Sequence, residues 1–298
     1  MHNHSHHLVC LLPARNCEAD LPGYFESVSR FADAIVALDD GSTDSTKILL
    51  TENPLVKIVL SNPVRKNYVG WDDSGNRNRL LAAVEPLKPT WCISLDADER
   101  ISQDDAQALI EFLKQGAVPG AAYGFRVYNM IDTLHTYDND PLWVYRLFSY
   151  RRGQRFPVTK LHFVPVPTDI PRGHWAKTTF RIQHLSSLTE ERRTARYQKY
   201  READPNCQFQ KNYEHLLNKP RNLQTWPDRV PGETILVSPE RHDRMRSHIF
   251  ENESVYREKL NPHRPTLSVI VISQNDRERI QEVMDAIVRQ KLDRSYEI

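Results

Sequence analysis

Two acidic residues separated by one position are the sharpest chemical feature of the sequence. Asp96 and Asp98 follow Trp91–Leu95 (WCISL), a short apolar run that predicts a buried strand. Two carboxylates just past the end of one strand can supply hard oxygen ligands to a single divalent cation, Mn²⁺ or Mg²⁺. Such a cation could bridge a diphosphate and stabilise the charge that develops on it as it leaves. The alternative is a solvated turn, but the buried strand before this DxD motif favours the metal site.

Two further apolar runs also end in polar residues. Leu8–Pro13 leads into Arg15, and Ala34–Leu38 leads into Asp39 and Asp40. In an open parallel sheet, ligands bind beyond the carboxyl ends of the strands. Surface loops often carry such residues, so each strand end alone is weak evidence. Their joint placement at successive strand ends predicts one binding crevice.

The elements that must position these residues alternate between strands and helices over the first hundred residues. Apolar runs predict the strands, and stretches with one apolar face predict the helices. Repeated alternation of this kind predicts a parallel sheet with helices on both faces. The predicted strands are Leu8–Pro13, Ala34–Leu38, Val56–Leu60 and Trp91–Leu95, and the predicted helices are Asp20–Phe31, a short one after Asp44, Asp73–Val84 and one from Ser102 to near Gly116.

The pattern changes after about residue 120. Strand-like segments follow one another without helices between them, which predicts a small antiparallel annex. Two charged helices, Leu188–Glu202 and Glu240–Leu260, come after it. The predicted class is therefore α/β, with a mostly parallel sheet flanked by helices, the annex, and a C-terminal helical extension. The strand-like segments of the annex are Tyr123–Met130, Leu142–Phe148, Leu161–Val166 and Thr179–His184.

The end of the chain resembles its beginning. Leu267–Asn275 (LSVIVISQN) aligns with Leu8–Asn16 (LVCLLPARN), and a helix-like segment follows in both places. This predicts the truncated start of a second domain; the alternative is a last strand and helix that complete the first domain. The predicted organisation is a His-rich tail at 1–7, a catalytic domain at 8–235, a helical extension and linker at 236–265, and the second domain from 266 to 298.

Composition excludes several classes of protein. Lys and Arg number 40 against 39 Asp and Glu, and the net charge of +1 argues against a nucleic-acid binder. No apolar run is long enough for a membrane span, and no signal peptide is recognisable, so a cytoplasmic protein is expected. The four cysteines lack CxxC spacing, which predicts reduced packing residues and neither zinc nor disulfides.

Four segments, in their order and spacing, resemble the family 2 glycosyltransferases of the GT-A fold. The resemblance extends over about residues 8 to 200. It implies a GT-A, Rossmann-like sheet, a nucleotide-diphosphate sugar as donor, a divalent metal in most members, and inversion at the anomeric centre. The segments are Leu8–Glu18 (LVCLLPARNCE), Ala37–Thr46 (ALDDGSTDST), Asp73–Leu81 (DSGNRNRLL) and Trp91–Arg100 (WCISLDADER).

The same resemblance implies roles for single residues. Carboxylates can accept hydrogen bonds from a base ring N–H and from ribose hydroxyls. An arginine can bind the base or the diphosphate through charge-assisted hydrogen bonds. The implied roles are base and ribose binding for Pro13, Arg15, Glu18, Asp39 and Asp40, base or diphosphate binding for Arg77, ribose or metal binding for Asp96, and metal binding for Asp98 and His184, with His162 and His174 as alternatives to His184.

The general base is not identified by the resemblance. Relatives with this DxD motif often carry a His-Glu pair where this chain has Lys160–Phe163 (KLHF), and the Glu is absent here. Asp138 and Asp140 are the candidate bases, since an inverting transfer needs a proton acceptor on the acceptor hydroxyl. A weakened or inactive transferase is the alternative.

Other functions fit less well. A haloacid-dehalogenase-like phosphatase would carry its DxD on the opening strand. A nucleotidyltransferase would show a Gly-rich loop after the first strand, and none is present. A nucleotide-sugar-binding module without turnover is the non-enzyme alternative. The acceptor class, whether glycan, lipid or protein, is open, and the locally basic segment Arg146–Arg201 is compatible with a diphosphate or peripheral membrane contact, although a mixed solvated surface is favoured.

Overall fold

The computed structural model of the chain describes residues 7–138, 141–220, 222–230 and 232–259. The chain divides into two compact units, Met1–Met245 and Arg246–Ile298, which are described separately. The predicted tail, apart from His7, and the predicted second domain lie outside the described residues. The domain boundaries drawn from the sequence therefore stay predictions.

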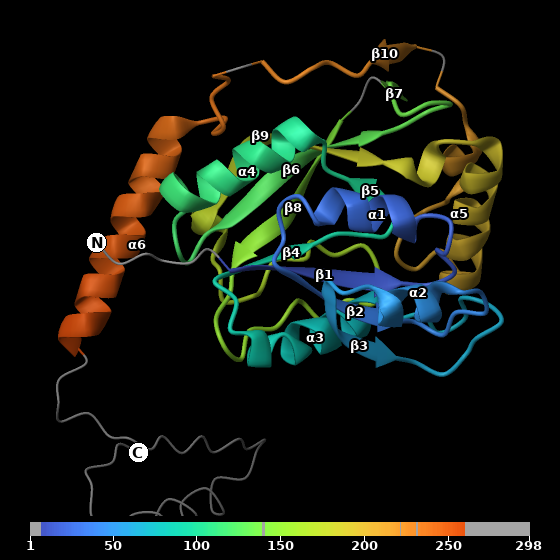
Figure 1. The fold of residues 1–298 in the computed structure, drawn as a ribbon, viewed down its shortest axis with the longest axis horizontal. Helices are drawn as coiled ribbons and strands as arrows, with labels where there is room; N and C mark the ends of the chain where they lie inside the picture. The colour runs from blue at the N-terminus through green and yellow to red at the C-terminus, as the bar shows by residue number, and fades with distance from the viewer. Residues whose placement is uncertain (1–6, 139–140, 221, 231, 260–298) are drawn as a thin grey trace, which may run out of the picture. The chain divides into compact units, whose positions relative to one another are not determined.

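One eight-stranded sheet forms the centre of the first unit, with the strand order β3-β2-β1-β4-β8-β6-β9-β5 (Figure 1). Its first four strands are parallel, as expected. Nearly every side chain of β2, β1 and β4 is buried, because helices cover both faces of this half of the sheet. These strands are β1 (Leu8–Ala14), β2 (Ala34–Asp39), β3 (Val56–Ser61) and β4 (Trp91–Ser94).

The helices between these strands pack on opposite faces. Tyr24 of α1 (Leu21–Val28) contacts Cys10 of β1, whereas Leu80 of α3 (Asp73–Ala83) joins the cluster around Val9 on the other face. Figure 1 draws α3 well apart from α1 and α4. The remaining helices here are α2 (Thr46–Glu52), the short η1 (Glu85–Leu87) and α4 (Gln103–Gln115).

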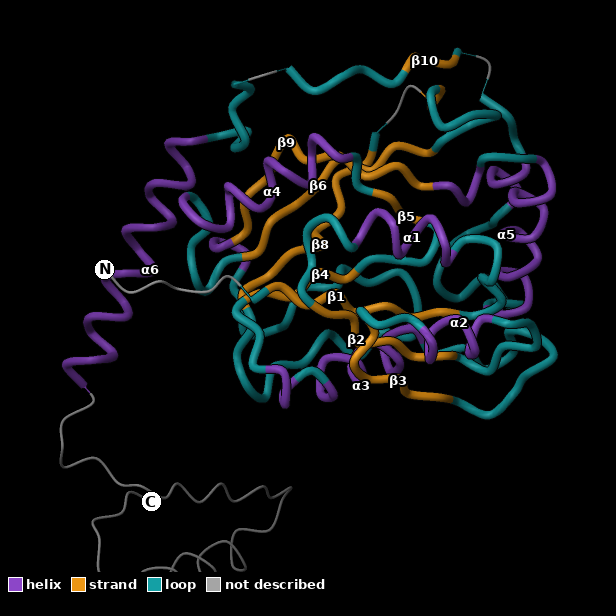
Figure 2. The backbone as a smooth tube through the Cα atoms, in the orientation of Figure 1, coloured by secondary structure: helices purple, strands orange, loops and turns teal. Residues whose placement is uncertain are grey.

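The expected small antiparallel part is present, although most of the strands after residue 120 belong to the main sheet. These strands form the second half of that sheet, with β8 antiparallel to β4 and β6, and β9 parallel to β6. Figure 2 shows the strands of both halves joined in one layer. In the described ranges, the separate antiparallel part is the pair β7–β10. The bounds are β5 (Glu99–Arg100), β6 (Ala122–Asn129), β7 (Thr136–Asp138), β8 (Leu142–Ser149), β9 (Trp175–His184) and β10 (Leu223–Thr225).

The strand predicted at Leu161–Val166 is wrong. This segment is a loop, although Leu161 and Val166 are each only 1% exposed. Prolines at 165 and 167 have no N–H to donate to a sheet ladder, so these residues bury their side chains without pairing. Burial alone produced the strand-like pattern.

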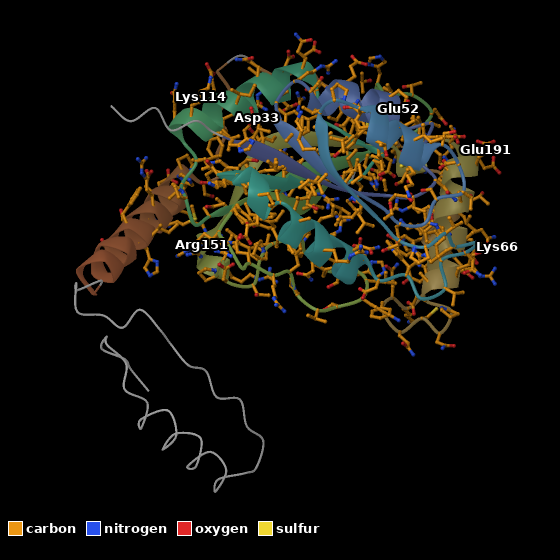
Figure 3. The ribbon with its side chains drawn as sticks, turned by 60° about the horizontal axis from the view of Figure 1, so that its bottom comes forward. Asp33, Glu52, Lys66, Lys114, Arg151 and Glu191 are labelled. Atoms are coloured by element: carbon orange, nitrogen blue, oxygen red, sulfur yellow. The ribbon has the colours of Figure 1, made fainter. Side chains whose placement is uncertain are left out.

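Two longer helices complete the described chain. α5 (Glu190–Ala203) follows β9, and α6 (Pro239–Lys259) begins in the first unit and ends in the second. No helix in the described ranges is long and apolar enough to cross a membrane. Exposed charges of both signs lie on many elements (Figure 3), in keeping with the near-neutral net charge. Short 3-10 helices occur at η2 (Arg172–His174), η3 (Leu185–Ser187) and η4 (Glu214–Leu217).

Candidate active site

The polar ends of β1, β2 and β4 meet at one edge of the sheet. The parallel register pairs Ala14 with Asp39 and Leu11 with Ser94, so Arg15, Asp40 and Asp96 all follow strands that end at the same edge. This juxtaposition follows directly from the parallel pairing. The crevice expected from the sequence has its polar residues on this edge.

Asp98 and His184 are brought together by the pairing of β5 with β9. Glu99 pairs with His184 in the sheet, and the backbone N–H of Leu185 donates to the carbonyl of Asp98 at 2.8 Å. As a result, Asp98 Oδ2 lies 3.5 Å from His184 Nε2. Both side chains are partly exposed, at 27% and 16%. Two of the three residues expected to bind metal are therefore neighbours.

A hydrogen-bonded chain continues behind His184. Its Nδ1 lies 3.1 Å from Oδ1 of Asn129, which is opposite His184 in the β6–β9 register. Asn129 Nδ2 donates to Asp138 Oδ2 at 3.0 Å. Asp138, expected as a general base, thus lies on β7 and contacts the histidine through Asn129. Asn129 was missed by the sequence reading, although it shares the signal of the other sites, a polar residue closing an apolar strand.

Asp96 is held by two arginines. Arg77 Nη2 lies 2.5 Å from its Oδ1, and Arg146 Nη2 lies 3.3 Å from its Oδ2. Burial raises the pKa of Asp96, but the charges of Arg77 and Arg146 outweigh this effect and lower that pKa to about 2. Asp96 is consequently an anion at neutral pH. Arg146 had stood out in the sequence only as one of many basic residues.

Arg77 is buried and fully engaged by the protein. It is 6% exposed, donates to Ser94 Oγ at 2.7 Å, and bonds both oxygens of Asp73 at 3.1 Å in addition to Asp96. Burial lowers the pKa of Arg77, but the neighbouring carboxylates raise it well above its usual value. Its contacts hold Asp96 of the DxD motif in place. The guanidinium is not oriented toward solvent, as contact with a base or a diphosphate would require.

Lys199 of α5 adds a cation beside the acidic pair. Its Nζ lies 4.2 Å from the ring centroid of Trp71, with the rings of Tyr200 and Tyr68 at 5.6 and 5.7 Å. Among the described residues no carboxylate lies within ion-pair distance of Nζ. Burial raises the pKa of Asp98, but His184, Lys199 and Arg196 together hold that pKa well below its usual range.

Arg15 organises the loop before α3. Its Nη1 donates to the carbonyl of Asn67 at 2.6 Å and its Nη2 to that of Arg65 at 2.8 Å. The guanidinium also lies 4.1 Å from the ring centroid of Tyr68. Arg15 and Tyr68 thereby form a wall beside the ends of β1 and β2.

The two acids after β2 have different partners. Asp39 Oδ1 accepts the backbone N–H of Ser42 at 3.2 Å. Asp40 forms an ion pair with Arg65 and accepts from Asn62 Nδ2 at 2.5 Å. Both acids are buried, at 2% and 4% exposure. They are therefore structural members of this end of the sheet as well as candidate ligands of a nucleoside.

The remaining predicted residues lie near these acids or outside the description. Pro13 pairs with Leu38 in the sheet, and Glu18 Oε2 accepts the backbone N–H of Ser45 at 2.9 Å. Asp140 falls on residues that the structure does not describe.

The described residues do not assemble a metal site with three protein ligands. Within the described part of the chain, no group of three or more His, Cys, Asp or Glu side chains lies together as a metal cage would require. Asp98 and His184 are adjacent, whereas Asp96 is occupied by Arg77 and Arg146. A metal bound at Asp98 and His184 would need ligands besides these two side chains.

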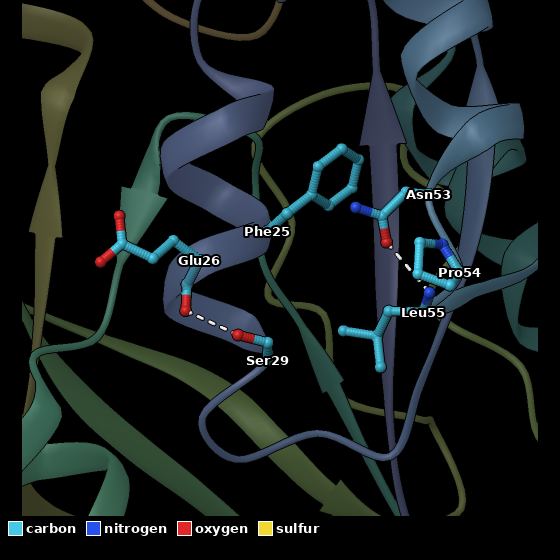
Figure 4. Close-up of a pocket in the computed structure, with 6 residues that line it drawn as sticks. All are labelled: Phe25, Glu26, Ser29, Asn53, Pro54 and Leu55. Atoms are coloured by element: carbon cyan, nitrogen blue, oxygen red, sulfur yellow. Dashed lines mark hydrogen bonds between the residues drawn. The ribbon is translucent and has the colours of Figure 1, made fainter.

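A hollow of about 470 Å³ lies elsewhere in the first unit (Figure 4). It is next to the amino ends of β2 and β3, since Ile35 N–H donates to the carbonyl of Leu55. It is therefore at the opposite end of the strands from the polar edge and takes no part in the candidate site. Its lining residues are Phe25, Glu26, Ser29, Asn53, Pro54 and Leu55.

Comparison with known proteins gives one family and several relatives. Residues 10–168, more than half of the chain, match the family described as Glycosyl transferase family 2. The lipopolysaccharide core biosynthesis glycosyltransferase LpsC of Rhizobium meliloti (strain 1021) is 34% identical over 120 residues. That match covers 40% of this chain and 39% of LpsC, so the chain spans less than half of its relative's length.

Solved structures are similar over part of the chain. TarS of S. aureus matches 70% of this chain and 41% of its own, with a TM-score of 0.38 and 12% identity. Glucosyl-3-phosphoglycerate synthase of Mycobacterium tuberculosis, solved with Mg²⁺ and uridine diphosphate, matches 42% of this chain and 44% of its own, with a TM-score of 0.31 and 23% identity.

Proposed function

The chain belongs to the family 2 glycosyltransferases, and we propose on this premise that it transfers a sugar from a nucleotide-diphosphate sugar to a hydroxyl of an acceptor. The transfer would invert the anomeric centre and use a divalent metal, Mn²⁺ or Mg²⁺. The observation that carries the proposal is the pairing of Asp98 with His184 at the polar edge of the sheet, 3.5 Å apart and partly open to solvent.

The contacts of His184 support a metal ligand. Because Asn129 Nδ2 donates to Asp138, the oxygen of the same amide faces the histidine and accepts from Nδ1. A metal at Nε2 would then take the place of the hydrogen that a protonated Nε2 offers to Asp98. Metal-binding histidines commonly donate their other ring N–H to a neighbouring acceptor in this way. Asn129 and Asp138 would thus orient the ligand.

The donor set also suits these metals. Mg²⁺ is usually held by one or two carboxylates and completes its coordination with substrate phosphates and water. Asp98 and His184 would hold the ion, with Asp96 at the metal or the ribose. When bound, the metal would offset the charge that develops on the departing diphosphate. Lys199, a cation with three aromatic neighbours and no described carboxylate partner, would add to that effect.

The nucleoside would bind at the ends of β1 and β2. Arg15 and Tyr68 provide a cationic and aromatic wall, and the carboxylates of Asp39 and Asp40 can accept from a base ring N–H and ribose hydroxyls. Pro13 and Glu18 would complete this subsite. Arg77 would act through Asp96, given its contacts.

The acceptor class is open, and a glycolipid is the first to test. LpsC is named a lipopolysaccharide core biosynthesis glycosyltransferase, and this name is the reason for testing that class first. Glycan and protein acceptors follow in the same assay.

Thermal unfolding with a panel of UDP-, GDP- and dTDP-sugars, with and without Mn²⁺, tests the proposal. A ligand that binds only the folded state raises its apparent stability. We expect the sugar donors of one nucleotide class to raise the melting temperature more with Mn²⁺ than without it. The protein should also hydrolyse these donors slowly, which releases the nucleoside diphosphate. Stabilisation without any turnover would indicate a binding module, and no stabilisation by any donor would contradict the proposal.

A further inference from the structure

A second hydrogen-bonded chain lies beside the candidate site. Asp204, which follows α5, accepts the hydroxyl of Tyr213 at 2.8 Å, and His162 Nε2 lies 3.0 Å from the same hydroxyl oxygen. Asp204 and Tyr213 are each 3% exposed, whereas His162 is exposed. An open imidazole is therefore backed by a buried tyrosine and a buried carboxylate.

The proton positions in this chain follow from the donors available. Asp204 also accepts the backbone N–H groups of Gln208 and Phe209 at 2.7 and 3.0 Å, which suits an ionised carboxylate. The single hydroxyl proton of Tyr213 is donated to Asp204, so the Tyr213 oxygen can only accept from His162. Nε2 must then carry the hydrogen, and the lone pair of the neutral ring lies on Nδ1. His162 consequently presents a proton acceptor at its open nitrogen.

The backbone and the stacking hold His162 in place. Its φ of 57° lies in the left-handed region, which non-glycine residues adopt rarely and which is common at functional sites. The ring stacks on Tyr200 and Tyr213, with centroids 5.2 and 5.9 Å away. The carbonyl of Lys160 accepts the backbone N–H of Asp73 at the start of α3, which ties this loop to that helix.

The charges around His162 connect it to the candidate site. Its charged neighbours are the acids Asp204 and Asp73 and the α5 cations Arg196 and Lys199. Lys199 and Arg196 are also the cations that lower the pKa of Asp98. Burial lowers the pKa of His162, the two acids partly oppose this effect, and the two cations reinforce it. His162 is therefore neutral at neutral pH and able to take a proton.

We propose that His162 is the general base of the transfer, with Tyr213 and Asp204 as its positioning residues; this inference rests on the proposed function. The acceptor hydroxyl loses its proton to His162 Nδ1 as its oxygen bonds to the anomeric carbon. The bond from that carbon to the diphosphate breaks, and its electron pair leaves with the nucleoside diphosphate. The imidazolium then releases the proton to water. His162 thus supplies the function of the absent Glu.

The test measures the release of nucleoside diphosphate to water as a function of pH, using the sugar donor that stabilises the chain. Water takes the place of the acceptor hydroxyl and needs the same base. The variant is His162→Asn, because Asn tolerates a left-handed backbone. The matched control is His135→Gln, an exposed histidine in another loop. Donor binding is followed by thermal unfolding in the same samples.

For the parent and the control we expect a rate that rises with pH and reaches its plateau by neutral pH. His162→Asn should lower the plateau by about 100-fold or more and flatten the profile, with donor binding unchanged. Tyr213→Phe should shift the midpoint of the profile. An unchanged rate in His162→Asn, or a loss of donor binding in that variant, would overturn the proposal. Flattening by Asp138→Asn instead would move the base to Asp138.

A second measurement does not depend on turnover. In the chain labelled with ¹⁵N-histidine, the His162 signals are assigned by their absence in His162→Asn among the 12 histidines. We expect Nε2–H and a bare Nδ1 near neutral pH, and loss of this preference in Tyr213→Phe. The opposite tautomer would overturn the inference, whereas failure of every donor to bind would count against the proposed function alone.

Discussion

Three neighbouring carboxylates after β4 differ in the direction of their pKa shifts because their surroundings differ. Burial raises the pKa of all three, but arginines outweigh it at Asp96, and His184 with two α5 cations outweighs it at Asp98. At Glu99, burial dominates over Arg146, and the pKa stays raised. The first two are therefore anions that can face a cation, while Glu99 lies 1% exposed beneath them and accepts the backbone N–H of Asp96 at 3.0 Å.

Asp98→Ala should abolish the Mn²⁺-dependent part of the donor-induced stabilisation, because it removes the only anionic member of the proposed metal-binding pair. His184→Ala should weaken metal binding less. Asn129→Ala should weaken it by about 10- to 100-fold, the usual effect of losing a residue that orients a ligand. Thermal unfolding with donor and a Mn²⁺ titration measures all three.

The control for these variants is Asp169→Ala, since Asp169 is a half-exposed partner of Arg151 at 3.1 Å. It should behave as the parent does. Equal Mn²⁺ affinity in Asp98→Ala and the parent would show that Asp98 is not a ligand.

Acid should destabilise the protein through Asp96. The pKa of Asp96 is lowered from 3.8 to about 2 in the folded protein. This difference stabilises the folded state at pH values above the pKa of the unfolded chain, and the stabilisation is lost as the pH falls through the pKa of the folded protein. The shift corresponds to about 2 kcal/mol, lost between about pH 4 and pH 2. Urea unfolding across this range should give a flatter pH dependence for Asp96→Asn than for the parent. Parallel curves for the two proteins would mean that Asp96 is not ion-paired in the folded state.

At the level of elements, short strands and caps decide where the site residues lie. β5 has only two residues, yet its pairing with β9 brings Asp98 to His184. The next helix, α4, is capped by Ser102, whose Oγ accepts the backbone N–H of Asp105 at 3.2 Å. Asp105 in turn binds Arg181 of β9 and Arg229 at 2.8 and 2.6 Å. The start of α4 thereby ties the DxD segment to the far half of the sheet.

Ser102→Ala should lower the free energy of unfolding by about 1 kcal/mol, the usual cost of losing an N-cap. Ser102→Thr, which keeps a hydroxyl that can accept from the Asp105 N–H and donate to Asp105 Oδ2, should recover most of that loss. Donor binding should change in neither variant because the cap lies outside the crevice. Urea unfolding measures the first effect, and a stability in Ser102→Ala equal to the parent's would show that the cap contributes nothing.

On the scale of the whole molecule, the first unit contains its own complete sheet. All eight strands lie within Met1–Met245. The strand-like run Val269–Ile272 belongs to the residues outside the description, and its resemblance to β1 is evidence from sequence alone. The first unit therefore has the sheet and core that independent folding requires.

Truncation after Leu260 should leave the melting temperature and donor binding of the first unit unchanged and improve solubility, since it removes the apolar sequence Val269–Ile272, and apolar sequences of high strand propensity promote association. Differential scanning calorimetry and light scattering of the truncated and full chains measure these effects. Unfolding on truncation would instead make the final segment part of a single domain.

The sequence by itself determined β1, β2, β4, the start of α4 and the acidic strand ends, because hydrophobic periodicity, capping and turn residues are local properties. Tertiary structure decided which polar residues meet. Asp98 lies beside His184, 86 positions along the chain, through sheet pairing, and Arg146 reaches Asp96 from β8. The chain of His162, Tyr213 and Asp204 likewise joins separate loops. The strand predicted at Leu161–Val166 is wrong because a loop that buries its side chains without sheet hydrogen bonds has the same apolar pattern as a strand. Contacts between distant residues depend on strand order and register, which no local pattern encodes.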